Sequence, residues 1–345
     1  MRLRRSSIET PGITRRRRGK GFSYEDGRGK PVRDEETLER IRALAIPPAW
    51  EEVRICADPV GHIQAAGTDA AGRRQYLYHA GWRVRRDAEK FDRMLAFARV
   101  LPRMRERVAR DLSLRGMPKD KALACAVRLL DQGFFRVGSE SYARQHGSFG
   151  LATLRKEHVK VQRDGIVFDF KAKSGVRRVQ TVHDPTVAPL VRTMKLRRSG
   201  GRELLAYRQG RRWRDVRSSD INEYVRDAAG GEFTTKDFRT WHGTVLAAVF
   251  LATGDKDANG ATSRKRIVSA SIREVAGYLG NTPAVARASY VDPRVVDRFE
   301  EGITIAATLE RLPVDEPTDA IFREGVEAAV LDLLQDDPEP ATRAA

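Results

Sequence analysis

Four short segments of the chain carry side chains of the types that act on phosphodiesters. They are RVGSESYA with Arg136 and Tyr142, FDFKAKSG with Lys171 and Lys173, KDFRTWHG with Lys236 and Arg239, and LGNTPAVARASYVDP with Asn281 and Tyr290. Each residue alone has an ordinary structural explanation, such as an ion pair or packing. Together they suit a phosphoryl centre, because planar guanidinium groups match two of its nonbridging oxygens better than an ammonium does.

A tyrosine in such a group can act as a nucleophile. Its hydroxyl attacks phosphorus and forms a covalent intermediate, which divides one difficult displacement into two reversible steps. The departing sugar oxygen then needs a proton, and a lysine whose pKa is lowered by neighbouring cations is a suitable donor. Because arginines neutralise the charge on the oxygens, this chemistry requires no metal ion.

The whole chain is strongly basic. Its 345 residues include 64 Lys and Arg against 47 Asp and Glu, which gives a formal net charge of +17. A surface of this charge attracts a polyanion, either nucleic acid or an anionic membrane. No apolar run approaches the roughly 18 to 20 residues that a spanning helix needs. We therefore expect duplex DNA as the partner and no membrane.

Several enzyme classes lack their signatures in this sequence. It contains no GxxxxGK[ST], GxGxxG, HExxH or GxSxG motif, so ATP and nucleotide cofactors have no support. Cys56 and Cys125 form no CxxC pair, and we expect both to be buried free thiols. Segment 255–266 resembles a calcium loop, but Arg266 stands where the closing Glu belongs. We expect no metal site and no cofactor.

The elements that must position these residues fall into four segments. Residues 1–24 predict a flexible basic arm, because closely spaced like charges repel. Residues 25–85 alternate short apolar runs with turn residues and predict a β-rich domain that contacts DNA. Residues 86–312 show helical periodicity and predict a mainly helical catalytic domain. Residues 313–345 predict an acidic helix and a frayed tail.

One stretch interrupts the helical domain. Residues 159–182 alternate like strands, with turns at Asp164-Gly165 and Ser174-Gly175, and predict three short strands. Helices are expected over residues 36–44, 185–196, 218–228, 236–252, 261–279 and 292–299. The predicted fold class is α+β: a small β-rich N-terminal domain, then a mainly α-helical domain that contains a short three-stranded sheet.

On these residues the chain resembles the bacterial, poxvirus-like type IB DNA topoisomerases, over roughly residues 25–310. The string IPPAWEEVRICADPVGHIQAAGTDAAGRRQYLYH is similar to that family's β-rich domain, and the remainder to its helical catalytic domain, which is related to the tyrosine recombinases. The resemblance implies relaxation of positive and negative supercoils through a 3′-phosphotyrosyl intermediate, without ATP or obligatory metal. It also implies a monomer in the bacterial cytoplasm, associated with the nucleoid.

The resemblance implies a role for each candidate residue. Arg136 in R-x(5)-Y and Arg239 in KDFRT match the two catalytic arginines, and Tyr290 matches the nucleophile. Lys173 matches the general acid, although Lys171 remains a rival on spacing alone. The expected DNA contacts are Tyr76, Tyr78, Arg74, Tyr142, Lys236 and Lys171.

One position departs from the family's viral members. They carry His nine residues before the nucleophile, where this chain has Asn281. The Asn amide can donate one hydrogen bond to a nonbridging oxygen. It carries no charge, so we expect it to stabilise the transition state without titrating near neutral pH.

Two other functions fit parts of the sequence. A site-specific tyrosine recombinase shares the Arg, Lys, Arg and Tyr chemistry. Recombinases usually carry H-x-x-R at the second arginine, however, and this chain has Lys236 three residues before Arg239. A non-catalytic architectural DNA-binding protein fits the charge, but it leaves the arrangement of the four catalytic residue types as a coincidence.

Overall fold

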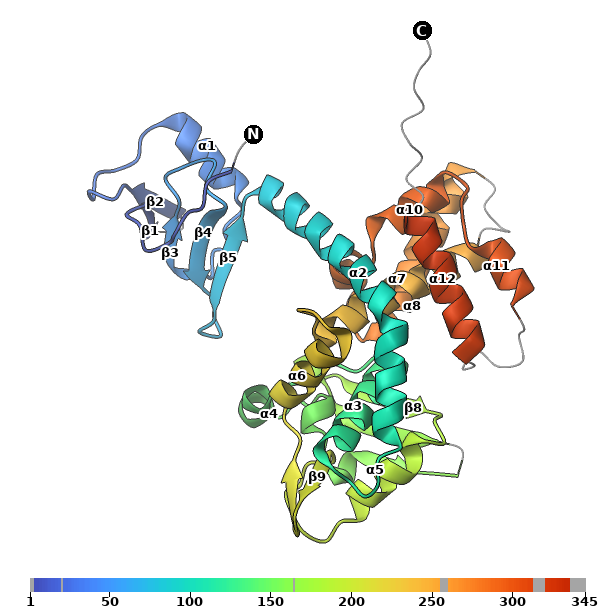
Figure 1. Ribbon diagram of the computed structural model, residues 1–345. Coiled ribbons are helices and arrows are strands. Elements are labelled where there is room, and N and C mark those ends of the chain that lie inside the picture. The colour runs from blue at the N-terminus through green and yellow to red at the C-terminus, as the bar shows by residue number, and fades with distance from the viewer. Residues whose placement is uncertain (1–2, 20, 164, 255–259, 313–319, 336–345) are drawn as a thin grey trace. The chain divides into compact units, whose positions relative to one another are not determined.

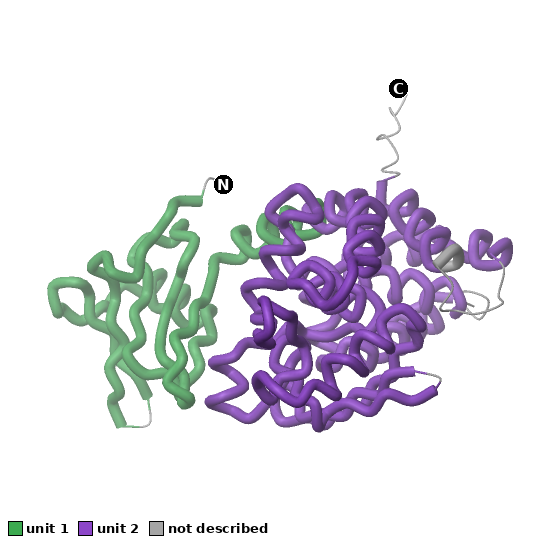
Figure 2. The backbone as a smooth tube through the Cα atoms, turned by 60° about the horizontal axis from the view of Figure 1, so that its bottom comes forward, with its two compact units in different colours: residues 1–92 green, residues 93–345 purple. Residues whose placement is uncertain are grey.

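The computed structural model describes residues 3–19, 21–163, 165–254, 260–312 and 320–335 (Figure 1). The chain divides into two compact units, residues 1–92 and residues 93–345 (Figure 2). The division falls inside the long helix α2 (Ala80–Leu112), a few residues after the expected boundary at residue 85. Helix α2 therefore leaves the first unit and continues into the second.

The first unit is built on an antiparallel sheet of five strands in the order β2-β1-β3-β4-β5. The strands are β1 (Ile13–Arg18), β2 (Gly21–Glu25), β3 (Glu51–Ile55), β4 (Ile63–Thr68) and β5 (Arg74–Tyr78). One helix, α1 (Glu35–Ala43), begins where the Asp34 side chain accepts a hydrogen bond from the Thr37 amide. Ile41 of this helix packs with Val53 and Ile55 of the sheet. The predicted β-rich N-terminal domain is confirmed.

The prediction of a flexible basic arm is wrong for the N-terminal segment. The Arg4 amide donates to the Val60 carbonyl at 2.9 Å, and the run of arginines forms β1 between β2 and β3. Strand alternation buries Ile13 and turns Arg15 toward the carbonyls of residues 46, 47 and 50. Arg15 also lies 4.1 Å from the Phe22 ring centroid. Carbonyl oxygens and an aromatic ring thus offset the repulsion that the sequence suggested.

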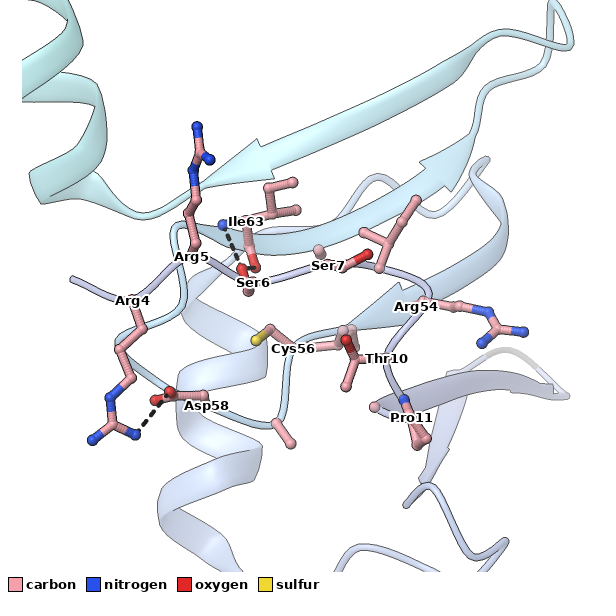
Figure 3. A pocket seen from close by; sticks show the side chains of 15 residues that line it. Arg4, Arg5, Ser6, Ser7, Thr10, Pro11, Arg54, Cys56, Asp58 and Ile63 are labelled. Atoms are coloured by element: carbon pink, nitrogen blue, oxygen red, sulfur yellow. Dashed lines mark hydrogen bonds and ion pairs between the residues drawn. The ribbon is translucent and has the colours of Figure 1, made fainter.

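This N-terminal segment encloses a cavity of about 260 Å³ against β3 and β4 (Figure 3). Figure 3 shows Arg5 and Arg54 extending outward, while Arg4 pairs with Asp58 at 3.5 Å. Cys56 lines the cavity and is half-buried rather than buried, whereas Cys125 is fully buried; both thiols are free. Because its arginines point away, this cavity gathers no cluster of positive charge.

The second unit is mainly helical. Its helices are α3 (Lys119–Gly133), α4 (Glu140–His146), α5 (Val187–Leu196), α6 (Ser218–Ala229), α7 (Thr235–Gly254), α8 (Ala261–Leu279), α9 (Pro283–Tyr290), α10 (Pro293–Glu300), α11 (Ala306–Arg311) and α12 (Ala320–Gln335). Helix α7 is apolar on most of its surface and packs against α3, α6, α8, α9, α10 and α12. It is the central helix of this unit, and Arg239 is its fifth residue.

Two small sheets accompany these helices. Strands β6 (Val159–Val161), β7 (Ile166–Lys171) and β8 (Arg177–Val182) form an antiparallel sheet in that order. The predicted α+β class with a short three-stranded sheet is confirmed. Sequence analysis missed the hairpin of β9 (Ala206–Gln209) and β10 (Arg212–Asp215). The predicted turn residue 164, the first part of the calcium-like segment (255–259) and the predicted frayed end (338–345) lie outside the described residues.

A buried ionic network joins the C-terminal helix α12 to the rest of this unit. Asp131 of α3 accepts hydrogen bonds from Arg105 at 2.9 Å and lies 3.0 Å from Arg323 of α12. It also contacts His242 of α7 at 3.3 Å, while Arg105 donates to Glu327 of α12 at 2.6 Å. Burial alone raises the pKa of a carboxyl group, but Arg323 and Arg105 hold the pKa of Asp131 well below its usual range.

We expect Asp131→Asn to lower the free energy of unfolding by about 3 kcal/mol, because it removes the buried anion that Arg105 and Arg323 share, while Arg105 keeps its pair with Glu327. The depressed pKa of Asp131 stabilises the folded state above the unfolded pKa, near about 4, and this contribution is lost as the pH falls. The difference in unfolding free energy between wild type and variant should therefore shrink below about pH 4. Denaturant titrations over a pH series measure it.

Asp120→Asn is the matched control, because Asp120 lies exposed on the same helix. It should change the unfolding free energy by less than about 0.5 kcal/mol at every pH. A difference for Asp131→Asn that stays constant with pH contradicts the assignment of the stabilising charge.

Candidate active site

Three arginines from separate elements meet at the C-terminal end of α8. Arg178 of β8 donates to the carbonyls of residues 277, at 3.5 Å, and 278. Arg239 of α7 donates to the carbonyl of residue 279 at 2.8 Å, and Arg136 to that of residue 280 at 2.9 Å. The last carbonyls of a helix lack partners within the helix and form the negative end of its dipole. This arginine cluster, Arg136, Arg178 and Arg239, is therefore anchored on one helix end.

Arg239 is the most deeply buried member, with 4% of its surface exposed. Its second anchor is the Phe134 carbonyl, which accepts at 2.8 Å. Phe134 ends α3 with a φ of +52°, a strained conformation for a residue other than glycine. Burial and the nearby Arg136 lower the pKa of Arg239 to about 10. Its Nε has no hydrogen-bond partner among the described residues.

Arg136 joins the cluster to Asn281. It lies in the loop between α3 and α4, and its guanidinium also donates to the Asn281 Oδ1 atom. The turn that presents Asn281 depends on Gly280, which has a φ of +59°. The Asn281 Nδ2 group is buried and has no partner within the described part of the chain. The amide therefore keeps a free donor beside the arginines.

Tyr290 is the last residue of α9 and lies against the arginine cluster. The centre of the Arg239 guanidinium is 5.0 Å from its ring centroid. The Thr244 hydroxyl donates to its carbonyl at 3.3 Å. A Cβ atom on Gly243 would lie 2.5 Å from the same carbonyl oxygen, so α9 can approach α7 this closely only at a glycine. The sequence KDFRTWHG thus supplies both the cation and the space for the tyrosine.

Electrostatics favour the phenolate form of Tyr290. Burial opposes ionisation of its hydroxyl, but Arg239, Arg136 and Lys236 outweigh that effect and lower the pKa of Tyr290. Lys236 is exposed and precedes Arg239 by three residues on α7. A tyrosine with a lowered pKa is a stronger nucleophile near neutral pH.

The two candidate lysines lie at the tip of the β7–β8 hairpin. A short 3₁₀ turn, Lys173–Gly175, closes the tip, with Ser174 at a φ of +64°. The side chains of Lys171 and Lys173 are exposed. Across the described ranges, no hydrogen bond or ion pair links either amine to Arg136, Arg239 or Tyr290. The structure thus brings Arg136, Arg239, Asn281 and Tyr290 together, whereas both lysines are exposed at the hairpin tip.

The remaining candidates are exposed or half-exposed. Tyr76 and Tyr78 are 40% and 38% exposed on the edge strand β5, with their ring centroids 6.3 Å apart. Arg74 lies two residues before Tyr76 on the same face and is 3.9 Å from the Glu52 carboxylate. In the second unit, the half-buried Tyr142 ring lies 4.4 Å from the His146 ring on α4.

Sequence analysis missed Arg178. It noted the alternation of β8 but not which face each arginine occupies. Arg177 points outward and pairs with Asp169 at 2.6 Å, whereas Arg178 shares the inner face of the strand with the buried Val182. Arg178 lies four residues before the buried Val182, so strand alternation puts both side chains on the same face. This spacing could have identified Arg178 from the sequence.

Neither a metal centre nor a membrane span is found in the parts that the structure describes. No group of three or more His, Cys, Asp or Glu side chains there could hold a metal ion. No helix there is long and apolar enough to cross a membrane.

Both parts of the chain match families of known proteins. The family described as the catalytic core of eukaryotic DNA topoisomerase I matches residues 79–310, and the family described as the N-terminal domain of bacterial DNA topoisomerase IB matches residues 21–69. DNA topoisomerase 1B of Acanthamoeba polyphaga mimivirus is 32% identical over 320 residues, which cover 90% of this chain and 94% of the viral protein. DNA topoisomerase 1B of Vaccinia virus, strain Copenhagen, is 22% identical over 284 residues, covering 79% and 85%.

We expect Lys236→Ala to raise the pKa of Tyr290, because it removes a positive charge that stabilises the phenolate. The rise should diminish with added salt, since Lys236 is exposed. The ¹³C NMR shift of labelled tyrosine Cζ atoms during a pH titration measures it, with the Tyr290 signal assigned by its loss in Tyr290→Phe. Lys160→Ala, an exposed lysine on β6, should leave the titration unchanged. An unchanged titration in Lys236→Ala contradicts the electrostatic account.

Proposed function

The chain belongs to the type IB DNA topoisomerases, and from this we propose that it relaxes DNA by cutting one strand with Tyr290. The observation that supports this assignment is the position of the Tyr290 ring under Arg239, beside Arg136 and Asn281. The hydroxyl that would attack, the cations and an amide donor thus come from one site. The family match also favours this function over a recombinase or a non-catalytic DNA-binding protein.

The proposed reaction is a reversible transesterification. The Tyr290 oxygen attacks a DNA phosphorus, the bond from phosphorus to the 5′ oxygen breaks, and a 3′-phosphotyrosyl bond forms. The lowered pKa of Tyr290 eases loss of its phenolic proton to solvent water as the oxygen attacks. The departing 5′ oxygen takes a proton from Lys173 and leaves as a hydroxyl. Return of that hydroxyl to phosphorus reverses each step and restores the strand.

Unsatisfied donors in the site support binding of the phosphate. The buried Nε of Arg239 and the Nδ2 of Asn281 have no partner among the residues described. A buried donor without a partner costs about 1 to 3 kcal/mol. Two nonbridging phosphate oxygens held against Tyr290 could accept from these donors and from Arg136. The same donors would then stabilise the charge that develops on the oxygens during transfer.

The covalent intermediate explains how relaxation can proceed without an energy source. Bond energy is retained in the phosphotyrosine, so religation requires no ATP. The free 5′ end allows the duplex to rotate, and supercoils of either sign are released. The fixed arginines would neutralise the phosphate, so we propose that no metal ion is obligatory.

We propose that the half-buried Arg74 and the exposed Tyr76 and Tyr78, which share one face of β5, contact the DNA, together with Tyr142, Lys236 and Lys171. The net charge of +17 favours phosphate binding along the duplex. We also propose that the two units act together as a clamp on DNA. We further propose that the protein works as a monomer on the nucleoid of a bacterial cytoplasm.

We expect Tyr290→Phe to abolish plasmid relaxation while DNA binding changes less than threefold, because the ring and its contact with Arg239 remain. Relaxation is measured with supercoiled plasmid in EDTA and without ATP, and binding by gel shift. Tyr207→Phe, on β9, is the matched control and should relax DNA normally. Trapping the enzyme on suicide DNA, followed by mass spectrometry, should locate the nucleotide on Tyr290. A nucleotide attached to another residue refutes the assignment.

We expect Lys173→Ala to slow strand cleavage by about 10² to 10⁴, the usual contribution of a general acid. A 5′-phosphorothiolate, whose sulfur leaves without a proton, should restore most of the rate. Single-turnover cleavage of suicide DNA with either leaving atom measures both effects. If Lys171→Ala shows this pattern and Lys173→Ala does not, Lys171 is the general acid.

A further inference from the structure

Arg178 occupies a place that the proposed reaction leaves without a role. It follows Lys173 by five residues, on the strand β8 that leads away from the hairpin tip. Its guanidinium donates to the carbonyls of residues 277 and 278, and its Nε donates to the Gln180 side chain at 3.1 Å. One side chain therefore attaches the strand that follows Lys173 to α8, which ends two residues before Asn281.

The opposite side of the hairpin is attached elsewhere. Phe168 and Phe170 of β7 lie against Phe135, with ring centroids 4.8 and 6.2 Å apart respectively. These contacts fix β7 to the end of α3, close to Arg136 in the sequence. Arg178 fixes β8 to the end of α8. The hairpin is thus held from two sides, and its tip carries Lys173 without contacts of its own to the arginine cluster.

The backbone just after α8 passes close to the Arg178 guanidinium. A Cβ atom on Gly280 would lie 2.4 Å from the Arg178 Nη1 atom. Gly280 thus leaves room for the guanidinium as well as turning the chain toward Asn281. Arg136 and Arg178 bind neighbouring carbonyls at the end of α8. The same helix end therefore positions both the hairpin and the groups that would bind phosphate.

We propose that Arg178 is a positioning residue that docks the Lys173 hairpin on the end of α8 and so places the general acid for proton transfer to the 5′ oxygen. It contacts backbone carbonyls rather than a group that reacts. Lysine cannot replace it, because one ammonium does not reproduce a planar fork with two separate donors. The inference rests on the proposed role of Lys173 as general acid.

The test compares single-turnover cleavage of suicide DNA that carries either a 5′ oxygen or a 5′ sulfur leaving atom. We expect Arg178→Ala to slow cleavage of the oxygen substrate by about 10², the scale of a small misplacement of a reacting group. The same variant should lose less than tenfold on the sulfur substrate. Arg178→Lys should show the same pattern with a smaller loss. It serves as the second variant if Arg178→Ala fails to give a cooperative thermal transition.

Two further variants complete the test. Arg177→Ala is the matched control on the same strand, where the side chain forms an exposed pair with Asp169; it should match wild type on both substrates. The double variant Lys173→Ala, Arg178→Ala should cleave the oxygen substrate no more than threefold slower than Lys173→Ala alone. Both changes impair the same step, proton transfer to the 5′ oxygen, so their effects should not add.

Equal losses of Arg178→Ala on both substrates overturn the proposal, since they indicate an effect on the phosphate or on the fold. The proposal is also overturned if the double variant cleaves the oxygen substrate more slowly than Lys173→Ala by the full factor that Arg178→Ala loses alone. If Lys173→Ala itself loses equally on both leaving atoms, the general acid has been misassigned, and this failure is visible without any Arg178 variant.

Discussion

The contact between three guanidinium groups and the end of α8 organises the active site. Burial lowers the pKa of Arg178 and of Arg239, and Arg136 lies close enough that its charge lowers both further. Such a cluster repels itself in a partly buried site, where charges are less screened than in water. The carbonyls of residues 277–280 carry the negative end of a helix dipole and offset this repulsion. Their attraction fixes the arginines in place before any phosphate binds.

The position of Tyr290 depends on the same arrangement. Its ring lies beside Arg239, and its backbone passes Gly243 where a larger residue would collide. Helix α7 supplies Arg239 and Gly243, which lie about one turn apart, and α9 supplies Tyr290. The lowered pKa of Tyr290 is therefore a consequence of packing that brings a buried cation and a phenol together. In the proposed reaction, nucleophile activation and oxyanion binding therefore draw on one set of charges.

The sequence allowed prediction of residues whose chemistry is local and failed where partners are distant. The motifs around Arg136, Arg239, Asn281 and Tyr290 identified four groups that the structure brings together, because residue type and short spacing carry that information. The arginines of β1 were misassigned to a flexible arm, because Arg15 is held by carbonyls about thirty residues away. Their charge was visible in the sequence, whereas the acceptors depend on the tertiary fold.

Two charge networks that include residues of α7 show how charge is divided between stability and chemistry. In the first, Asp131 and Glu327 balance Arg105 and Arg323, and Asp131 also contacts His242. In the second, in the described ranges, no carboxylate pairs with the arginine cluster or with Lys236, and the compensating groups are carbonyl dipoles. A dipole offsets repulsion but supplies no net negative charge. The balanced network can hold the helices together at neutral pH without a ligand, whereas the arginine cluster retains positive charge that a DNA phosphate can neutralise.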